Sequence, residues 1–220
     1  MCKKDDCRCC IVGLTEDERA SLFTLLRHVI YFVLMTLSIL GMWEIGKIYG
    51  PDCVAEDGLI EDIEAVTLLV SGLIFLAEAA LTQRYRTLAF WLAALCFAAT
   101  CRELDFFFDH NLPVISWKFC YLFPLAAIAY AATHREGLKD AFFTFIRSNT
   151  FYLLLCAVLV IVIIAQAVAH RSFLADVLGG GIDMSLTRRV IEEPIELVGY
   201  LLILFSTYDF YAELISKEKK

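Results

Sequence analysis

Five ionisable residues close a long apolar stretch near the middle of the sequence: Arg102, Glu103, Asp105, Asp109 and His110. A charge toward the middle of a bilayer costs on the order of 2.5–3.5 kcal/mol, so such groups persist where they pair or face a polar interior. On a continuous helix Arg102, Asp105 and Asp109 share one face, and Arg102 can pair with Asp105. These residues are therefore candidates for a functional site.

A second group of acids opens the last apolar segment. Glu192, Glu193 and Glu196 lie within about one helical turn of one another, and Arg189 precedes them at a spacing that lets it reach Glu192 or Glu193. Pro194 either occupies the first turn of a helix or frees a backbone carbonyl at a kink. In either case, backbone amide or carbonyl groups without a partner in the helix lie beside the carboxylates.

Polar residues in another apolar segment follow helical spacing. Glu64, Thr67, Ser71 and Glu78 fall at offsets of 0, 3, 7 and 14, which places them on one stripe of a helix. Gly72 beside the stripe would let a neighbouring helix approach closely. Two interpretations stay open: the hydroxyls bond to other helices or to their own backbone, or Thr67, Ser71 and Glu78 line a polar path.

The composition is typical of an integral membrane protein. Of 220 residues 60% are hydrophobic, and the mean hydropathy is +0.68, which is too apolar for a soluble domain. About 20 apolar residues cross a bilayer as a helix. We therefore expect an all-α, polytopic membrane bundle of six transmembrane helices, at about 22–43, 62–81, 87–108, 114–133, 149–170 and 190–210.

The domain organisation follows from these spans. Residues 1–21 form a cytoplasmic, Cys-containing segment, residues 22–211 the six-helix domain, and residues 212–220 a basic cytoplasmic tail. With both termini inside, thirteen Lys and Arg residues flank the cytoplasmic ends of the spans and five flank the outer ends. We expect a multi-pass protein of the inner (plasma) membrane. The first apolar run is too long and starts too late for a cleavable signal peptide.

The partners expected from this arrangement are the lipid bilayer and protons or cations. The net charge of −7 reflects acids on the outer side, so no nucleic-acid partner is expected. A homo-oligomer or a membrane-complex partner stays open.

Local signals add four further expectations. Thr15 and Glu18 have the spacing of a capping box that starts the first helix. Pro124, near the middle of the fourth span, should kink it. The residues from Arg171 to Thr187 read as a loop in which Gly179–Gly181 could flex over an outer cavity. Cys53 and Cys120 both lie on the outer side, where a disulfide is conceivable.

Cysteine and histidine placement raises two other cofactor questions. Four cysteines lie in the N-terminal segment: Cys2, Cys7, Cys9 and Cys10. Their spacing matches no standard zinc module, so we expect free thiols in preference to lipidated or metal-bound cysteines. Four histidines sit at span ends, as two bis-His haems would require: His28, His110, His134 and His170. They lie at or beyond the apolar boundary, so haem is not expected.

Helix rise brings the charged groups to a common depth. At about 1.5 Å per residue, five of the six spans deliver polar side chains to the outer third of the bilayer. We infer an outward-facing acidic cavity with Arg102 and Arg189 as charge partners. Its candidate metal ligands are Glu64, Glu103, Asp105, Asp109, His110, His170, Glu192, Glu193 and Glu196. Acids outnumber bases, so either a cation balances the excess or some carboxyl groups are protonated.

Three functions fit this cavity. The first is a small transporter or channel for protons or a divalent cation, with a path along the stripe toward His134 and Asp209. The second is a membrane metalloenzyme or metal sensor, because carboxylate and imidazole ligands suit Mn, Fe or Zn; no Glu-x-x-His motif of ferritin-like sites occurs. The third is a structural or assembly subunit. No nucleophile elbow, phosphate loop or His-Glu-x-x-His motif indicates a reaction.

Overall fold

The computed structural model describes residues 15–55, 58–111, 117–178 and 183–218, and within these ranges the chain is helical without strands. The predicted all-α class is confirmed. The chain divides into two units, Met1–Gly41 and Met42–Lys220. The four N-terminal cysteines and Gly179–Gly181 lie outside the described residues, so the predictions for them are not addressed.

Three stretches of helix are long and apolar enough to cross a membrane: Glu18–Val54, Leu59–Leu81 and Asn149–Val168. A shorter apolar helix covers Lys118–Thr133. The predicted spans at 87–108 and 190–210 are not among these stretches. Both carry several charged residues, and residues 87–108 are also divided between two helices. The chain thus has the character of a membrane protein, with three spans of the predicted six supported.

The first unit contains the start of α1 (Glu16–Tyr49). The Thr15 amide donates to the Glu18 carboxylate at 2.7 Å, and the Glu18 amide donates to the Thr15 hydroxyl at 3.3 Å. This reciprocal pair confirms the predicted capping box. The helix up to Gly41 is rich in large apolar side chains, as expected of a helix that could cross a membrane.

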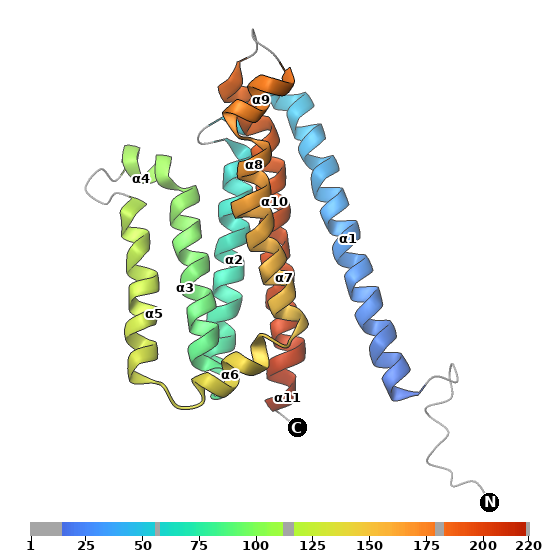
Figure 1. The fold of residues 1–220 in the computed structure, drawn as a ribbon, viewed down its shortest axis with the longest axis vertical. Helices are drawn as coiled ribbons and strands as arrows, with labels where there is room; N and C mark the ends of the chain where they lie inside the picture. The colour runs from blue at the N-terminus through green and yellow to red at the C-terminus, as the bar shows by residue number, and fades with distance from the viewer. Residues whose placement is uncertain (1–14, 56–57, 112–116, 179–182, 219–220) are drawn as a thin grey trace, which may run out of the picture. The chain divides into compact units, whose positions relative to one another are not determined.

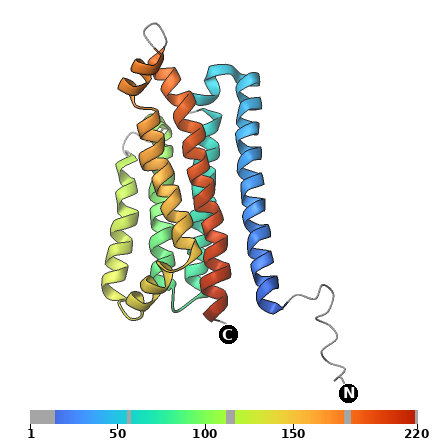
Figure 2. The same ribbon diagram turned by 45° about the vertical axis from the view of Figure 1, so that its right-hand side comes forward.

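In the second unit each long helix packs on the next, and neighbouring helices are antiparallel except for α2 and α10, which run parallel to each other (Figures 1 and 2). The order of packing is α5 (Leu122–Thr133), α3 (Arg86–Glu103), α2 (Leu59–Leu81), α10 (Met184–Phe210) and α7 (Asn149–Val158). The shorter elements are η2 (Gly50–Val54), α4 (Asp105–Asn111), η3 (Trp117–Tyr121), α6 (Leu138–Phe145), the π-helical η4 (Leu159–Ala165), α8 (Gln166–Val168), α9 (Arg171–Leu178), the π-helical η5 (Tyr211–Ile215) and α11 (Ser216–Glu218).

We call the end of this unit that holds α6 the α6 end. Its core is aromatic: the ring of Phe210 lies 5.7 Å from Phe75, 6.2 Å from Tyr85 and 6.3 Å from Phe145, each in an edge-on arrangement. Phe210 is fully buried. Edge-on aromatic pairs contribute beyond their buried area, so this cluster ties α2, α3, α6 and α10 together.

The last residues of the chain also pack at the α6 end. Leu214 and Ile215 are buried, and Glu218 accepts hydrogen bonds from the backbone amides of Gln83 at 3.1 Å and Arg84 at 3.2 Å, and from the Thr82 hydroxyl. The segment predicted as a tail from residue 212 therefore continues the last helix as far as Glu218. It holds the turn between α2 and α3.

Two glycines allow close helix contacts. A Cβ atom on Gly72 would lie 2.8 Å from the Phe97 ring and 3.2 Å from the Cys96 Cβ, so the predicted close approach at Gly72 is confirmed. A Cβ atom on Gly199 would lie 2.3 Å from the Ile161 side chain. Gly199 therefore lets α10 press against the π-helical segment η4.

The structure bears on three further local predictions. Pro124 lies in the first turn of α5, directly after the 3-10 turn η3, inside the helical stretch Lys118–Thr133, and the kink expected there stays a prediction. Residues 171–178 form α9, so the predicted loop is helical over that range. Cys53 and Cys120 are buried free thiols rather than a disulfide, and the Cys53 thiol instead donates to the Gly50 carbonyl.

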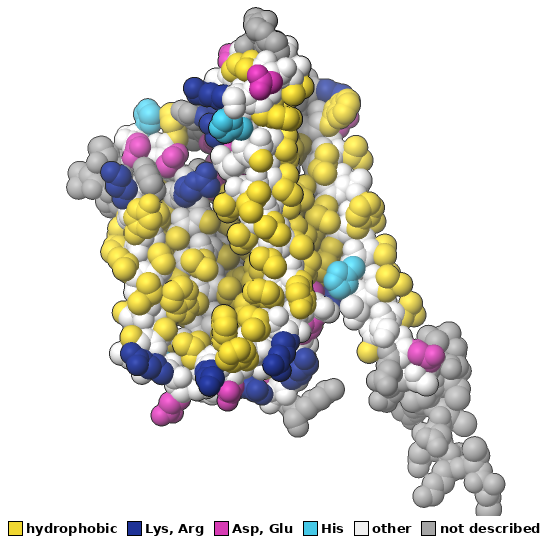
Figure 3. Space-filling view, viewed as in Figure 1, with side chains coloured by type: hydrophobic (Ala, Val, Ile, Leu, Met, Phe, Trp, Pro, Cys, Tyr) yellow, Lys and Arg dark blue, Asp and Glu magenta, His cyan; other side chains and the backbone are white. Residues whose placement is uncertain are grey.

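The surface of the second unit separates apolar from charged side chains. Figure 3 shows a broad band of hydrophobic side chains between a lower rim with Lys and Arg and an upper end where acids, bases and histidine gather. The turns and short helix at the α6 end carry exposed bases, among them Arg84, Arg135, Lys139 and Arg147. This pattern matches a protein surrounded by lipid at its middle.

Candidate functional site

A cavity of about 520 Å³ lies at the end of the second unit opposite α6, and we call it the acidic cavity. Its walls come from α2, α3, α4, α9 and α10. Seven carboxylates and four guanidinium groups line it, so its excess charge is negative. The lining residues are Glu61, Arg102, Glu103, Asp105, Phe106, Asp109, His110, Arg171, Ser185, Arg188, Arg189, Glu192, Glu193 and Glu196.

Three carboxylates from three helices meet beside this cavity. Glu64 on α2, Glu103 on α3 and Glu196 on α10 each offer an oxygen atom, and these atoms lie within 4.8 Å of one another. We call these residues the carboxylate trio. Two ligands of one ion lie at most twice the metal–oxygen bond apart, about 4–5 Å. The trio therefore has the dimensions of a site for a single ion.

Glu64 is the most buried member of the trio. Its exposed fraction is 0%, and neither carboxyl oxygen has a hydrogen-bond partner among the described residues. The carboxyl groups of Glu193, Glu103 and Glu196 are neighbours of Glu64, and Glu193 comes within hydrogen-bond reach of it when one of the two carries a proton. A buried polar group without a partner loses its hydration without compensation, so Glu64 is where the site lacks a positively charged or donating partner.

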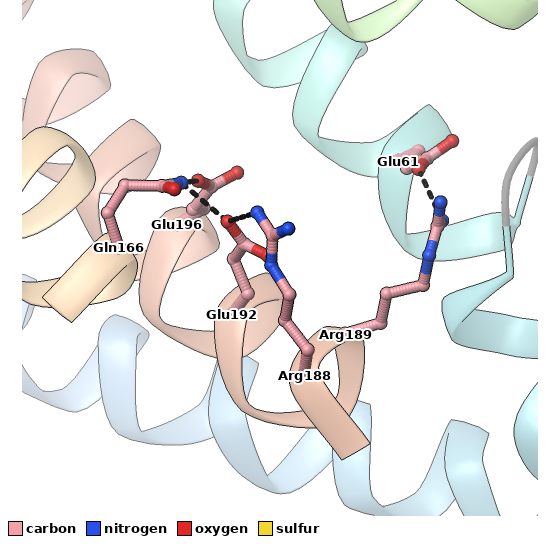
Figure 4. Close-up of polar contacts among 6 residues, drawn as sticks. All are labelled: Glu61, Gln166, Arg188, Arg189, Glu192 and Glu196. Carbon is pink, nitrogen blue, oxygen red and sulfur yellow. Dashed lines mark hydrogen bonds and ion pairs between the residues drawn. The ribbon is translucent and has the colours of Figure 1, made fainter. Parts of the chain in front are cut away.

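Neighbouring side chains orient the other two members. The Tyr200 hydroxyl donates to Glu103 at 2.7 Å, and the Arg102 guanidinium lies 3.4 Å from the same oxygen. The Gln166 amide donates to Glu196 at 3.2 Å (Figure 4). These bonds leave Glu103 and Glu196 with fixed directions and with carboxylate oxygens free to face Glu64.

Gln166 also reaches Glu192, to which its amide donates at 2.5 Å. Gln166 directly follows the π-helical segment η4. A π-helical turn rotates the residues after it relative to a regular α-helix. This rotation directs the Gln166 amide toward α10, as Figure 4 shows.

Arginines close the rim of the acidic cavity. The Arg188 guanidinium binds both oxygens of Glu192, at 2.8 and 3.0 Å, one turn along α10. Arg189 reaches across to Glu61 on α2 at 3.3 Å (Figure 4). Glu192, one of the two predicted partners of Arg189, is thus paired with Arg188 instead. Arg189 still lies close enough to Glu193, the other predicted partner, to stabilise a negative charge there.

The continuous helix predicted over residues 87–108 is wrong. It is interrupted at Leu104, where α3 ends and α4 begins one residue later. Arg102, Asp105 and Asp109 therefore do not share one regular helical face, and the ion pair that the structure gives Arg102 is with Glu103, not Asp105. Asp105 and Asp109 line the cavity from α4 with exposed side chains.

The two histidines predicted as ligands do not join the trio. His110 lines the cavity but is exposed, and its ring stacks on Phe106 at 4.0 Å. His170 is exposed, with its Nδ1 atom 2.7 Å from the Ser172 hydroxyl. The donor set of the trio is therefore oxygen only. Oxygen ligands favour hard cations such as Mg²⁺, Mn²⁺ or Ca²⁺ over Zn²⁺.

The predicted stripe on α2 is buried along its whole length. The Thr67 hydroxyl donates to the Ile63 carbonyl at 2.7 Å, and the Ser71 hydroxyl donates to the Thr67 carbonyl at 2.8 Å. The bonding to the helix's own backbone is therefore observed, and the alternative of a polar path stays a prediction. Glu78 has an exposed fraction of 2%, and its carboxyl oxygens have no hydrogen-bond partner in the described part of the chain.

Five charged or polar residues that the structure places at the site are not among the candidate ligands and charge partners predicted from the sequence. Arg188 and Tyr200 carried a usable signal, since each lies four residues from a glutamate on α10 and therefore on the same face. Glu61, Gln166 and Arg171 reach the site from other helices. No sequence spacing predicts those contacts, because they depend on how the helices are rotated.

No family model, curated protein or solved structure matches this chain. The geometry of the trio and of the acidic cavity is thus the basis for a functional interpretation.

Proposed function

We propose that this chain is an integral membrane protein that binds one divalent cation at the carboxylate trio and acts as a small transporter or channel. The observation that carries this proposal is Glu64: a fully buried carboxyl group with no hydrogen-bond partner among the described residues, facing Glu103 and Glu196. An ionised carboxylate left unpaired in a protein interior costs several kcal/mol. A cation with oxygen ligands supplies the partner that this group lacks.

The membrane arrangement we propose is the six-span bundle with both termini in the cytoplasm. Three helical stretches with the length and apolar character of spans support it. The exposed bases Arg84, Arg135, Lys139 and Arg147 gather at the α6 end, and bases concentrate on the cytoplasmic side of membrane proteins. The acidic cavity then faces the outer side of an inner (plasma) membrane and collects cations from there.

Transport would carry the ion from the trio along the α2 stripe toward Glu78. Leu68 and Phe75 are fully buried in this interval, so passage requires the helices to move apart. Pro194 lies inside α10, beside the trio, and a proline within a helix weakens it at that point and allows bending. We propose that this bend opens the stripe.

A binding experiment tests the site. Mn²⁺ is titrated into the purified protein in non-ionic detergent, and free Mn²⁺ is measured by electron paramagnetic resonance. We expect one Mn²⁺ per chain for the wild type and at least about tenfold weaker binding for Glu64→Gln, since one of three charged ligands is lost. Glu78→Gln is the matched control, because Glu78 is a buried, unpartnered acid of the same helix outside the trio, and it should bind as the wild type does.

Equal Mn²⁺ affinity for Glu64→Gln and the wild type would overturn the proposed site. Uptake of Mn²⁺ into reconstituted vesicles then separates transport from a metalloenzyme or metal sensor built on the same centre. Only a transporter or channel moves the ion, and Glu64→Gln should abolish the uptake. Undiminished uptake by this variant would exclude the proposed transport route.

A structural role is the second candidate, favoured by the cross-helix hydrogen bonds of Tyr200 to Glu103 and of Gln166 to Glu196. Such a network fixes how the helices sit against each other. If it were the whole function, the wild type would bind no Mn²⁺, and Glu103→Gln would lower the thermal midpoint without changing any ion flux.

A further inference from the structure

An apolar crevice of about 280 Å³ lies among α2, α3, α6, α7 and α10. Leu68 and Phe75 are fully buried in it, while Leu95, Leu155 and Val158 are each more than two-fifths exposed. The lining residues are Leu68, Phe75, Leu92, Leu95, Cys96, Ala99, Phe145, Phe151, Leu154, Leu155, Val158 and Ile203. The crevice therefore reaches from the core to an apolar surface, where α3 and α7 present their side chains to lipid.

The crevice and the acidic cavity share no lining residue but follow one another along the same helices. Leu68 is one helical turn from Glu64 on α2, and Ala99 is one turn from Glu103 on α3. One turn of an α-helix advances about 5.4 Å. The trio thus forms the boundary between a polar chamber and an apolar one, and both chambers use the faces of α2, α3 and α10.

An acidic site one helical turn from a hydrocarbon-lined crevice fits an amphiphile with a positive head group. The acids of the cavity outnumber its arginines seven to four, and Glu64 adds a further acid that is buried and unpartnered among the described residues. An anionic head group would meet this excess of like charge, whereas an ammonium group is electrostatically complementary. The apolar lining of the crevice offers close packing along a hydrocarbon chain.

We infer that the carboxylate trio and the apolar crevice together bind a long-chain amine. Its ammonium group lies at the trio and its hydrocarbon chain lies in the crevice, having entered between α3 and α7 from the membrane. The inference rests on the proposed function in one respect, that the trio takes up positive charge. It adds the chemical class of an organic ligand for the same site.

Native mass spectrometry of the protein released from non-ionic detergent tests this inference. The probes are dodecylamine, dodecanol and dodecanoic acid, which share a chain, and butylamine, which shares only the head group with dodecylamine. We expect one bound dodecylamine per chain and at least about tenfold weaker retention of the three other probes, because each lacks either the charge or the chain contacts.

Ala99→Phe fills the crevice one turn below the trio and leaves every charge in place. It should weaken dodecylamine binding about tenfold, since the ring occupies space needed by the chain. The matched control is Ala126→Phe on α5, an exposed position outside the crevice, which should bind dodecylamine as the wild type does. Retained Mn²⁺ binding by Ala99→Phe shows that this variant is folded with the trio intact.

The outcomes separate the two proposals. Equal retention of dodecylamine and dodecanoic acid, or undiminished dodecylamine binding by Ala99→Phe, overturns the inference of a long-chain amine site. Neither result affects the proposed Mn²⁺ binding. Dodecylamine binding without any Mn²⁺ binding overturns the divalent-cation proposal and supports the inference. A wild type that binds neither overturns both.

Discussion

The two ends of the second unit each bury a glutamate of α2 that lacks a hydrogen-bond partner among the described residues, but the surroundings of the two differ. Glu64 lies among other carboxylates beside a cavity, whereas two residues close to Glu78 along α2, Phe75 and Ala79, belong to the hydrophobic core of the α6 end. Burial without a partner is thus common to both and does not by itself identify a site. What distinguishes Glu64 is the convergence of further ligand atoms from α3 and α10.

The largest effect is expected in the aromatic core at the α6 end. Phe210→Ala removes a fully buried ring with three aromatic neighbours, and such a loss costs about 3–5 kcal/mol. The thermal midpoint in detergent should fall steeply, while Phe143→Ala, which removes a 45% exposed ring of α6, should change it little. Similar midpoints for the two variants would refute the view that this end carries the stability of the unit.

A smaller loss is expected where α10 meets the π-helical segment. Gly199→Ala places a methyl group 2.3 Å from the Ile161 side chain, and overpacking of this kind costs about 1–3 kcal/mol. Gly46→Ala is the control, because its methyl group meets nothing within 4 Å. Both midpoints are measured by thermal unfolding. A Gly199→Ala variant as stable as Gly46→Ala would show that the close contact is not required.

Loss of one cross-helix bond at the cavity end should be milder still. Tyr200→Phe removes the 2.7 Å hydrogen bond to Glu103, and a typical intramolecular hydrogen bond contributes about 0.5–1.5 kcal/mol. Mn²⁺ affinity should fall by a few-fold, because Glu103 is less well oriented, with a small drop in midpoint. Unchanged affinity would mean that Tyr200 does not position the trio.

The smallest effect is expected at Glu78, where a substitution should stabilise the protein, in contrast to Glu64. Glu78→Leu replaces a buried carboxyl group that has no hydrogen-bond partner in the described residues with an apolar side chain, and this should raise the stability by about 1 kcal/mol. Its Mn²⁺ binding should match that of the wild type. A lower thermal midpoint would show that Glu78 serves a structural or ligand-binding purpose and would remove the contrast with Glu64.

The sequence predicted those features that depend on one helix. The capping box at Thr15, the close approach at Gly72 and the common stripe of polar residues on α2 all follow from spacing along a single segment, and the structure agrees with each. The gathering of Glu103, Glu192 and Glu196 around one cavity could also be anticipated, because charged groups in apolar segments must avoid lipid.

Contacts between helices could not be predicted in the same way. The partners of Arg102 and Arg189 depend on the break at Leu104 and on the rotation of α10 against α2. The π-helical turn before Gln166 has no recognisable signal in a run of Leu, Val and Ile. The short helices α6 and α9 were missed because each lies between apolar segments and is too short to show a clear period.

An anomalous-scattering map of the protein crystallised with Mn²⁺ tests the cation site most directly. We predict a single strong peak about 2–2.5 Å from carboxylate oxygens of Glu64, Glu103 and Glu196, at distances expected for hard cations with oxygen ligands. A map at saturating Mn²⁺ with no peak at the trio, or with peaks only beside the exposed acids Asp105 and Asp109, would contradict the account.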